Sequence, residues 1–460
     1  MTTCVQIGRG ARARDAPRAT PRAGASGRAH PRRMRRLKKA PHRRAPVRIA
    51  LAGGRRAASA AQPLSSRAPL AGQVGSSPLA CSLMGPECGY ALRCERGRAW
   101  PRSRRGDRGA KSMRIAIVST PFIRVPPSGY GGTELFCHEL AEGLSARGHE
   151  VTLFATGDSV VSCRRRSLYG SPSWPPAPED EVNHVAWAFS EIAREDGFDV
   201  IHVNSPIAVP FTRFVRVPAV HTLHHAPCGE SSRIYARHPE VAYVAISARQ
   251  RALEIPLPRS CVIHHGVTPA RYPPSLSDEG YLAHLGRYAE EKGTHLALDV
   301  ARAAGLPIKL AGRAHPKDRI YYLQEVAPRL RESGISDLGE MGHDRKVALL
   351  RGARAVLCPL QWEEPFGLIA IEAMLCGTPV LGFRRGSFPE IVDEGVTGYL
   401  APPGDLSRLA ALAAGLTRFD RAACARRARE RWSSAVMVGK YEELYRTVTG
   451  PRRAEGSRAA

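Results

Sequence analysis

From residue 113 onward, short apolar runs alternate with amphipathic stretches. The first of these runs have the length and branched composition of buried strands, and they lie at 115–118, 151–154, 200–203, 219–221 and 244–246. A stretch with helical spacing, 133–147, follows the first run. Because strands that alternate with helices form βα units around a parallel sheet, residues 113–270 are predicted to form one Rossmann-like domain.

A second series of the same kind starts at residue 281. Its predicted strands are 281–285, 308–311, 355–358 and 378–381, and its predicted helices are 294–304, 319–332, 345–351 and 367–375. A Pro- and Ser-rich stretch, 269–277, suits an interdomain linker. We therefore expect an α/β protein of two Rossmann-like domains, 113–270 and 278–430, facing a central cleft. A C-terminal helix at 431–449 could cross back to the first domain.

Charge is distributed unevenly along the 460 residues, whose formal net charge is +26. Residues 1–112 contain 26 Lys and Arg but only four acidic residues, which leaves a net charge of +4 for the remainder. The remainder therefore gives no reason to expect a nucleic-acid partner. Residues 1–112 are also poor in large apolar side chains, which predicts a disordered Arg-rich extension. Three explanations of this extension stay open: it could be upstream sequence from a mis-assigned start codon, a targeting segment or a polyanion-binding arm.

The chain has no apolar run of 18 residues, so the sequence predicts no membrane-spanning helix. Peripheral contact with a membrane stays open. The 11 cysteines are scattered, without the spacing of metal ligands, which indicates reduced thiols. We therefore expect a cytoplasmic protein.

A basic turn bounded by glycines opens the second domain, with the sequence Gly286-Arg287-Tyr288-Ala289-Glu290-Glu291-Lys292-Gly293. It follows a predicted strand and precedes a helix, so backbone N–H groups and the positive helix end would meet a ligand there. Arg287 offers a planar fork and Lys292 a point charge, a combination that suits a diphosphate. A solvated basic turn is the competing interpretation.

Two carboxylates eight positions apart, Glu364 and Glu372, lie in the stretch 363–374. Glu364 precedes a proline and is predicted in a loop, whereas Glu372 lies in a helix that begins near Gly367 and Leu368. With fully helical spacing the two would be about 12 Å apart, so one could reach a sugar and the other a ribose across a diphosphate. Two solvated charges would give the same pattern, but an unpaired Glu372 in an otherwise apolar helix would be costly.

Both stretches resemble the signatures of glycosyltransferase family four, whose members are retaining enzymes of the GT-B fold. The matching patterns are a Gly-Arg-x-x-x-x-Lys-Gly turn and two Glu separated by seven residues. Three later segments also resemble the family pattern, namely Cys376-Gly377-Thr378-Pro379-Val380, Gly386-Ser387-Phe388-Pro389-Glu390 and Gly395-Val396-Thr397-Gly398-Tyr399-Leu400. The resemblance covers residues 113–446 in order and spacing.

The resemblance implies a role for each matching residue. Arg287 and Lys292 would hold the donor diphosphate and stabilise charge on the departing nucleotide. Glu364 would bind donor sugar hydroxyls, and Glu372 would bind the ribose hydroxyls. The other donor-site residues implied are Gly286, Phe366, Gly367 and Leu368. Family members of this kind need no divalent metal and no cofactor besides the nucleotide-sugar donor, and residues 113–460 contain no Asp-x-Asp.

Two segments of the first domain could contribute to the same site. The loop Gly129-Tyr130-Gly131-Gly132-Thr133-Glu134 precedes a helix, with Thr133 as the expected N-cap. Gly131 and Gly132 would let backbone N–H groups approach phosphate or acceptor, although a simple tight turn would also use them. In the segment 221–225 the resemblance marks His224 as the residue beside the donor sugar, and His221 or His225 could take that place instead. At His265 many family members have Asn, a departure that bears on the acceptor side.

The sequence therefore predicts a retaining transferase that moves a hexose from a nucleotide-diphosphate sugar, UDP-sugar favoured, to an unidentified acceptor hydroxyl. A glycan, a small metabolite and a lipid-linked sugar are all open as acceptors. A glycoside hydrolase would also use two carboxylates, but it has no use for Arg287 and Lys292 beside a helix start. A nucleotide-sugar epimerase on the same fold and a catalytically degenerate binding protein also stay open.

Overall fold

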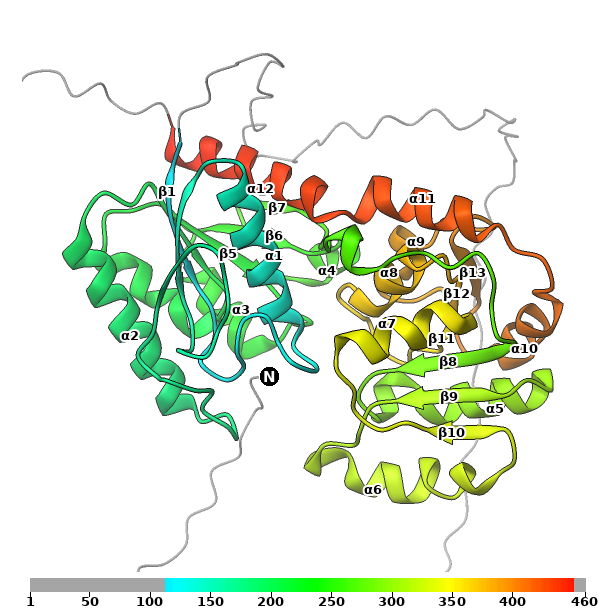
Figure 1. The fold of residues 1–460 in the computed structure, drawn as a ribbon. Coiled ribbons are helices and arrows are strands. Elements are labelled where there is room, and N and C mark those ends of the chain that lie inside the picture. The colour runs from blue at the N-terminus through cyan, green and yellow to red at the C-terminus, as the bar shows by residue number, and fades with distance from the viewer. Residues whose placement is uncertain (1–111, 451–460) are drawn as a thin grey trace, which may run out of the picture. The chain divides into compact units, whose positions relative to one another are not determined.

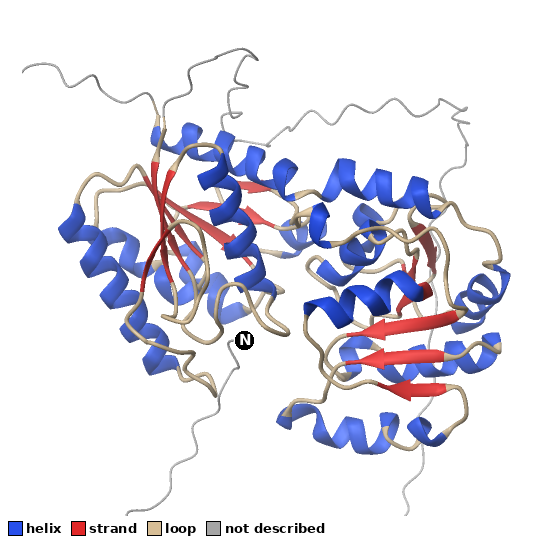
Figure 2. Cartoon of the chain, in the orientation of Figure 1, coloured by secondary structure: helices blue, strands red, loops and turns tan. Residues whose placement is uncertain are grey.

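The computed structural model of the protein describes residues 112–450. The predicted disordered extension, with its open origins, lies outside the described residues except for Ser112. The described part contains two parallel β-sheets with helices packed against them (Figures 1 and 2). Each sheet is buried on both faces by its own pair of hydrophobic clusters. The predicted architecture of two Rossmann-like units is therefore confirmed.

The first sheet has seven parallel strands in the order β3-β2-β1-β4-β5-β6-β7. Their bounds are β1 (Arg114–Val118), β2 (Glu150–Phe154), β3 (Arg164–Arg166), β4 (Val200–Val203), β5 (Ala219–Leu223), β6 (Ala242–Ala245) and β7 (Ser260–Val262). The sequence predicted five of these strands. The two edge strands, β3 and β7, escaped prediction because each has three residues and no run of large apolar side chains.

The second sheet has six parallel strands in the order β10-β9-β8-β11-β12-β13. Their bounds are β8 (Tyr281–Leu285), β9 (Ile308–Ala311), β10 (Ile335–Asp337), β11 (Ala353–Cys358), β12 (Val380–Phe383) and β13 (Gly398–Ala401). The sequence predicted β8, β9, β11 and β12. It missed the short edge strand β10, and it also missed β13, which lies in a segment noted only for its family pattern.

Helices connect these strands (Figure 1). Those of the first half, which we define by the first sheet, are α1 (Gly132–Ala146), α2 (Pro178–Glu195), α3 (Gly229–Ala236) and α4 (Ala248–Leu253). Those that follow are α5 (Thr294–Ala304), α7 (His343–Gly352), α8 (Leu368–Leu375), α9 (Phe388–Ile391), α10 (Leu406–Gly415), α11 (Arg421–Trp432) and α12 (Ser434–Thr449).

One predicted helix, 319–332, is wrong as a continuous element. The structure has a single α-turn, α6 (Arg319–Tyr321), followed by a π-helical turn at Tyr322–Val326 and a 3₁₀ turn at Arg329–Arg331. Pro328 explains the break, because proline lacks the N–H of a regular helix and its ring clashes with the preceding turn.

Within residues 112–450 the chain passes between the two halves twice, and the two connections are hydrogen-bonded to each other. The Val267 N–H donates to the Trp432 carbonyl at 3.0 Å, and the Ser434 N–H donates to the Val267 carbonyl at 2.9 Å. A Cβ on Gly266 would lie 2.4 Å from the Ser433 carbonyl oxygen, so only glycine fits this contact. After this crossing, α12 packs against α1 in the core of the first sheet.

A buried carboxylate, Glu442, fastens α12 to the end of α1. Arg147 donates to its Oε2 at 2.8 Å, and Arg446 also pairs with it. The Met113 N–H donates to Nδ1 of His149 at 3.1 Å, so in the neutral ring the proton lies on Nε2, which donates to Glu442 at 3.0 Å. Burial raises the pKa of Glu442, but His149, Arg446 and Arg147 outweigh burial and hold the pKa below its ordinary value.

A Glu442→Gln variant should therefore lose stability at neutral pH. A carboxyl whose folded pKa is depressed contributes stability above its unfolded pKa, and that contribution disappears as pH falls through the folded pKa. We expect a loss of about 1–2 kcal/mol at pH 7 that shrinks below about pH 4, measured by urea unfolding at several pH values. Glu443→Gln is the matched control, because the exposed Glu443 side chain is next to Glu442 on α12. Equal losses at pH 7 and at low pH would contradict this account.

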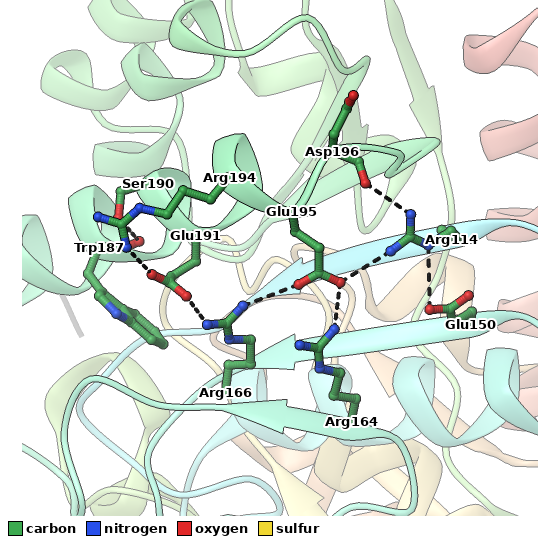
Figure 3. A network of polar contacts seen from close by, with 10 residues as sticks. All are labelled: Arg114, Glu150, Arg164, Arg166, Trp187, Ser190, Glu191, Arg194, Glu195 and Asp196. Atoms are coloured by element: carbon green, nitrogen blue, oxygen red, sulfur yellow. Dashed lines mark hydrogen bonds and ion pairs between the residues drawn. The ribbon is translucent and has the colours of Figure 1, made fainter.

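The edge strand β3 is made of three arginines, and its outer two, Arg164 and Arg166, pair with the end of α2 (Figure 3). The Glu195 carboxylate forms an ion pair with Arg164, with an N–O distance of 2.5 Å. It also pairs with Arg114 and with Arg166, each at 3.2 Å. Arg166 also pairs with Glu191. A strand edge covered by charged side chains resists pairing with another chain. The same charges explain why apolar periodicity gave no sign of this strand.

Candidate functional site

The motif residues of the second half follow the two strands at which the strand order reverses. β9 and β10 lie on one side of β8, whereas β11, β12 and β13 lie on the other. Gly286 comes directly after β8, and the loop that carries Glu364 comes after β11. Open parallel sheets bind ligands outside the carboxyl ends of the strands at such a reversal. The topology therefore brings both motifs to the place where a ligand is expected.

Arg287 lies in the turn after β8 with its guanidinium held by two acids. Its Nη1 donates to Asp318 at 2.9 Å, and its Nη2 pairs with Glu291. The side chain is only 12% exposed. Gly286 has a φ of +146°. A Cβ on Gly312 would lie 1.8 Å from the carbonyl oxygen of Gly286, so the two loops approach closely. The guanidinium is therefore oriented by fixed partners and retains further N–H donors for an anion.

Lys292 joins the first motif to the second. Its Nζ pairs with the Glu364 carboxylate and lies 4.9 Å from the ring centroid of Trp362. The Trp362 indole N–H donates to the same carboxylate at 2.8 Å. Burial lowers the pKa of Lys292, but the adjacent Glu364 outweighs burial and holds the pKa above its ordinary value. Lys292 therefore stays positively charged at neutral pH.

The Glu364 loop is braced by the segment that contains Gly386 and Ser387. The Ser387 N–H donates to the Glu364 carbonyl at 3.0 Å, and its hydroxyl donates to the Phe366 carbonyl at 2.6 Å. Gly386 has a φ of +60°, and a Cβ there would lie 2.5 Å from the Glu364 nitrogen. The brace fixes the position of the carboxylate next to Lys292.

Helix α8 begins directly after this loop. Gly367 precedes it with a φ of +91°, and a Cβ at Gly367 would lie 2.9 Å from the ring of Phe388. Leu368 is the first residue of α8, and its Cδ1 lies 3.4 Å from the position of a Cβ on Gly132. The glycine loop of the first half therefore comes within van der Waals reach of the start of α8.

Glu372 lies inside α8 with 3% of its side chain exposed. Its Oε1 accepts hydrogen bonds from the Tyr272 hydroxyl at 2.7 Å and from Lys346 Nζ at 2.6 Å. The buried carboxylate is therefore paired, which removes the cost expected for an isolated charge in an apolar helix.

In the first half, the expected N-cap at Thr133 is wrong. Helix α1 begins at Gly132, and Gly131 is the N-cap, with no side chain capping the helix. The Gly131 carbonyl already accepts the first helical hydrogen bond, from Leu135 at 3.0 Å. The buried Glu134 side chain accepts a hydrogen bond from Thr120 at 2.6 Å.

His224 follows β5 and is oriented by Asn204, which follows β4. The Asn204 side-chain amide donates to the Val118 carbonyl, so its oxygen faces His224 Nε2 at 2.9 Å. Burial, and then the neighbouring His265, lower the pKa of His224 well below its ordinary value. The neutral ring thus carries its proton on Nε2. Its Nδ1 is left as an acceptor for a ligand hydroxyl.

The other histidines of this segment are placed differently. His221 is buried between the Val203 carbonyl and the Tyr235 hydroxyl, whereas His225 is exposed. His265 stacks on His224, with ring centroids 5.6 Å apart, and contacts Phe366 edge-on at 5.2 Å. Through His265, the structure brings His224 of the first half near Phe366 of the Glu364 loop.

Comparison with known protein families matches both halves of the chain. A model described as Glycosyltransferase Family 4 matches residues 130–271, and one described as Glycosyl transferases group 1 matches residues 273–431. The chain belongs to glycosyltransferase family four. It is therefore a glycosyltransferase with the GT-B fold, and the resemblance inferred from the motifs is confirmed.

Individual relatives of this glycosyltransferase are distant but span most of it. Glycogen synthase of Mycobacterium tuberculosis is 26% identical over 69% of this chain and 89% of that protein. Phosphatidyl-myo-inositol mannosyltransferase of Mycolicibacterium smegmatis is 26% identical over 74% of this chain and 95% of that protein. The crystal structure of AviGT4, a glycosyltransferase involved in avilamycin A biosynthesis, has a TM-score of 0.55 at 27% identity and covers 73% and 98% of the two chains.

Sequence reasoning missed the residues that hold the motif side chains of the glycosyltransferase in place. Asp318 and Asn204, the partners of Arg287 and His224, lie at least 20 positions away in the chain. Tyr272 and Lys346, the partners of Glu372, belong to the linker and to α7. None of these residues carries a local pattern, because its contact exists only in the folded chain.

Two features are absent from residues 112–450 of the glycosyltransferase. No group of three or more His, Cys, Asp or Glu there could hold a metal ion. No helix in that range is long and apolar enough to cross a membrane. Independence from a divalent metal remains a prediction from the family resemblance.

Proposed function

We propose that this glycosyltransferase moves a hexose from a nucleotide-diphosphate sugar to an acceptor hydroxyl with retention at the anomeric carbon. UDP-hexose is the donor that we propose first, and no divalent metal takes part. The donor nucleotide would depart as the diphosphate, and one of its oxygens would help to deprotonate the acceptor arriving on the same face. The closure of the two halves would exclude water.

One observation supports this proposal most directly, namely the contact between Lys292 and Glu364 at the reversal of the second sheet. The pair places a fixed cation beside a carboxylate, with Arg287 in the adjacent turn. A diphosphate needs cations with oriented donors, and a sugar needs a carboxylate as hydroxyl acceptor. A hydrolase that uses two carboxylates would need neither cation.

In this arrangement each residue has a separate task. Lys292 and Arg287 would stabilise the charge that develops on the departing diphosphate, and Glu364 would orient the donor sugar. Gly286, Phe366, Gly367 and Leu368 would form the rest of the donor site, with Gly131 and Gly132 approaching from the first half. His224 would accept a hydrogen bond from a sugar hydroxyl through Nδ1. The acceptor could be a glycan, a small metabolite or a lipid-linked sugar, and we propose a cytoplasmic protein that could contact a membrane peripherally.

The test is nucleotide release by the full-length protein offered UDP-, GDP- and ADP-sugars. We expect release from one donor class, and a loss of at least about 100-fold in Glu364→Gln. Glu363→Gln is the matched control, because Glu363 is more exposed and pairs with Arg249 at 2.8 Å. It should stay within about threefold of the native protein, since a surface ion pair contributes little.

Different outcomes would favour different functions. Binding of nucleotide sugars without release in the presence of any acceptor would favour a catalytically degenerate binding protein. Conversion of the donor sugar without an acceptor would favour an epimerase. Failure of the protein to bind any nucleotide would overturn the proposal. Proton NMR of the anomeric centre in the first product formed tests retention.

A further inference from the structure

The ribose-binding role that the family resemblance implies for Glu372 requires a free carboxylate oxygen in a fixed direction. Glu372 is almost entirely buried in α8, with 3% of its side chain exposed. Both protein donors, Tyr272 and Lys346, bind the same atom, Oε1. Within residues 112–450 no side-chain or backbone group donates a hydrogen bond to Oε2. The carboxylate is thus held by one oxygen, and the other is left to accept from a ligand.

The two donors that hold Oε1 come from different parts of the fold. Lys346 lies on α7, in the same half as Glu372, and its Nζ also lies 5.8 Å from the ring centroid of Tyr272. Tyr272 lies in the linker between the sheets and is fully buried. Its ring packs edge-on against His343 at 5.2 Å. The tyrosine side chain is therefore fixed by packing on the second half as well as by its hydroxyl.

The linker residues just before Tyr272 are fastened to the first half. The Thr268 hydroxyl donates to Glu139 at 2.5 Å, and Arg271 lies 3.5 Å from the same carboxylate. Glu139 is a buried residue of α1, the helix that begins at Gly132. A continuous set of contacts thus leads from α1 through the linker to Glu372. Movement of the linker relative to α8 would change the direction of the Glu372 carboxylate.

We propose that Tyr272, assisted by Lys346, is a positioning residue that orients Glu372 toward the ribose hydroxyls of the donor. This inference rests on the proposed function, because it presumes a nucleotide donor. The linker tyrosine, rather than the donor-binding sheet alone, then determines how well the enzyme distinguishes a ribonucleotide from a deoxyribonucleotide. A hydrogen bond between a ribose hydroxyl and an oriented carboxylate is charge-assisted and strong, whereas a misdirected carboxylate loses most of it.

The test compares the binding of UDP, GDP and ADP, each beside its 2′-deoxy form, to the full-length protein by calorimetry. The native protein should bind the ribonucleotide that suits it about tenfold more tightly than its 2′-deoxy form. In Tyr272→Phe this ratio should fall to about threefold or less, mainly because the ribonucleotide binds more weakly. Lys346→Met supplies a second variant, which should lower the same ratio.

Tyr281→Phe is the matched control for Tyr272→Phe. Tyr281 is also a buried tyrosine, but it lies in β8, and its hydroxyl donates to the Leu349 carbonyl at 2.8 Å. This variant should retain the native ratio even if it loses stability. Loss of the ratio in Tyr272→Phe with retention in Tyr281→Phe would support the inference.

Three results would overturn the inference. An unchanged ratio in both Tyr272→Phe and Lys346→Met would remove the positioning role while leaving the proposed function intact. Equal binding of the two nucleotide forms by the native protein would do the same. Failure of the native protein to bind any of the nucleotides would overturn the proposed function and this inference together.

Discussion

Replacement of Lys292 by methionine should reduce transfer from the donor by about 100- to 1,000-fold. The Lys292 side chain is only 17% exposed, and its ammonium is charged and fixed beside Glu364, so it can stabilise the departing diphosphate without reorganisation. Methionine preserves much of the side-chain volume but removes the charge. Because the charge matters most as the bond to the diphosphate breaks, kcat should fall more than the affinity for the donor. Steady-state nucleotide release measured over a range of donor concentrations gives both quantities.

Lys309→Met is the matched control for this prediction. Lys309 belongs to the same half, and its Nζ lies 3.5 Å from the ring centroid of Tyr281 and 3.5 Å from Glu279. Its loss should leave kcat within about threefold of the native value, because it removes only a partly exposed cation. A Lys292→Met enzyme that keeps more than about a tenth of native kcat would contradict the electrostatic role. Unfolding by urea would show whether a low rate reflects misfolding instead.

Replacement of Gly293 by alanine should destabilise the second half by at least about 3 kcal/mol and also impair activity. Gly293 precedes α5 with a φ of +68°, where an alanine side chain is already strained. A Cβ there would also lie 2.1 Å from the Pro359 carbonyl oxygen, so the backbone must move. Pro359 directly follows β11, and Lys292 is the residue before Gly293. The movement would therefore separate the two motifs that meet at the Lys292 and Glu364 pair.

Gly305→Ala provides a control with nearly the same backbone conformation. Gly305 follows the other end of α5 with a φ of +66°, but a Cβ there meets nothing within 4 Å. It should cost about 1 kcal/mol, from backbone strain alone, and leave activity near the native level. Urea unfolding of both variants measures the difference. Equal destabilisation by the two substitutions would show that the contact with Pro359 has no effect.

The sequence predicted the fold well wherever an apolar run was long enough to form a strand alone. Strands such as β8 have four or five buried residues in succession, and the predicted bounds of these strands lie close to the observed ones. The edge strand β3 consists of three arginines, two of which pair with α2, so no apolar pattern marked it. The helix expected at 319–332 is broken in the structure because Pro328 cannot continue a regular helix.

The candidate site was predictable to the extent that its residues occur in ordered motifs. Arg287, Lys292 and Glu364 lie within short patterns that follow predicted strands, and the topology brings these patterns to one reversal of the sheet. The partners that orient them could not be found in the same way. Asp318 and Tyr272 meet Arg287 and Glu372 only after distant segments fold together, and neither residue type signals that contact by itself.

The paired connections between the two halves have a mechanical consequence. A single flexible linker would let one half rotate freely relative to the other. Here two connecting segments are joined, because hydrogen bonds link Val267 to Trp432 and to Ser434. Two connections bonded side by side resist torsion while they still allow bending. The two halves of this enzyme would then open and close by bending in a single direction, with the junction at Gly266 and Ser433 as the hinge.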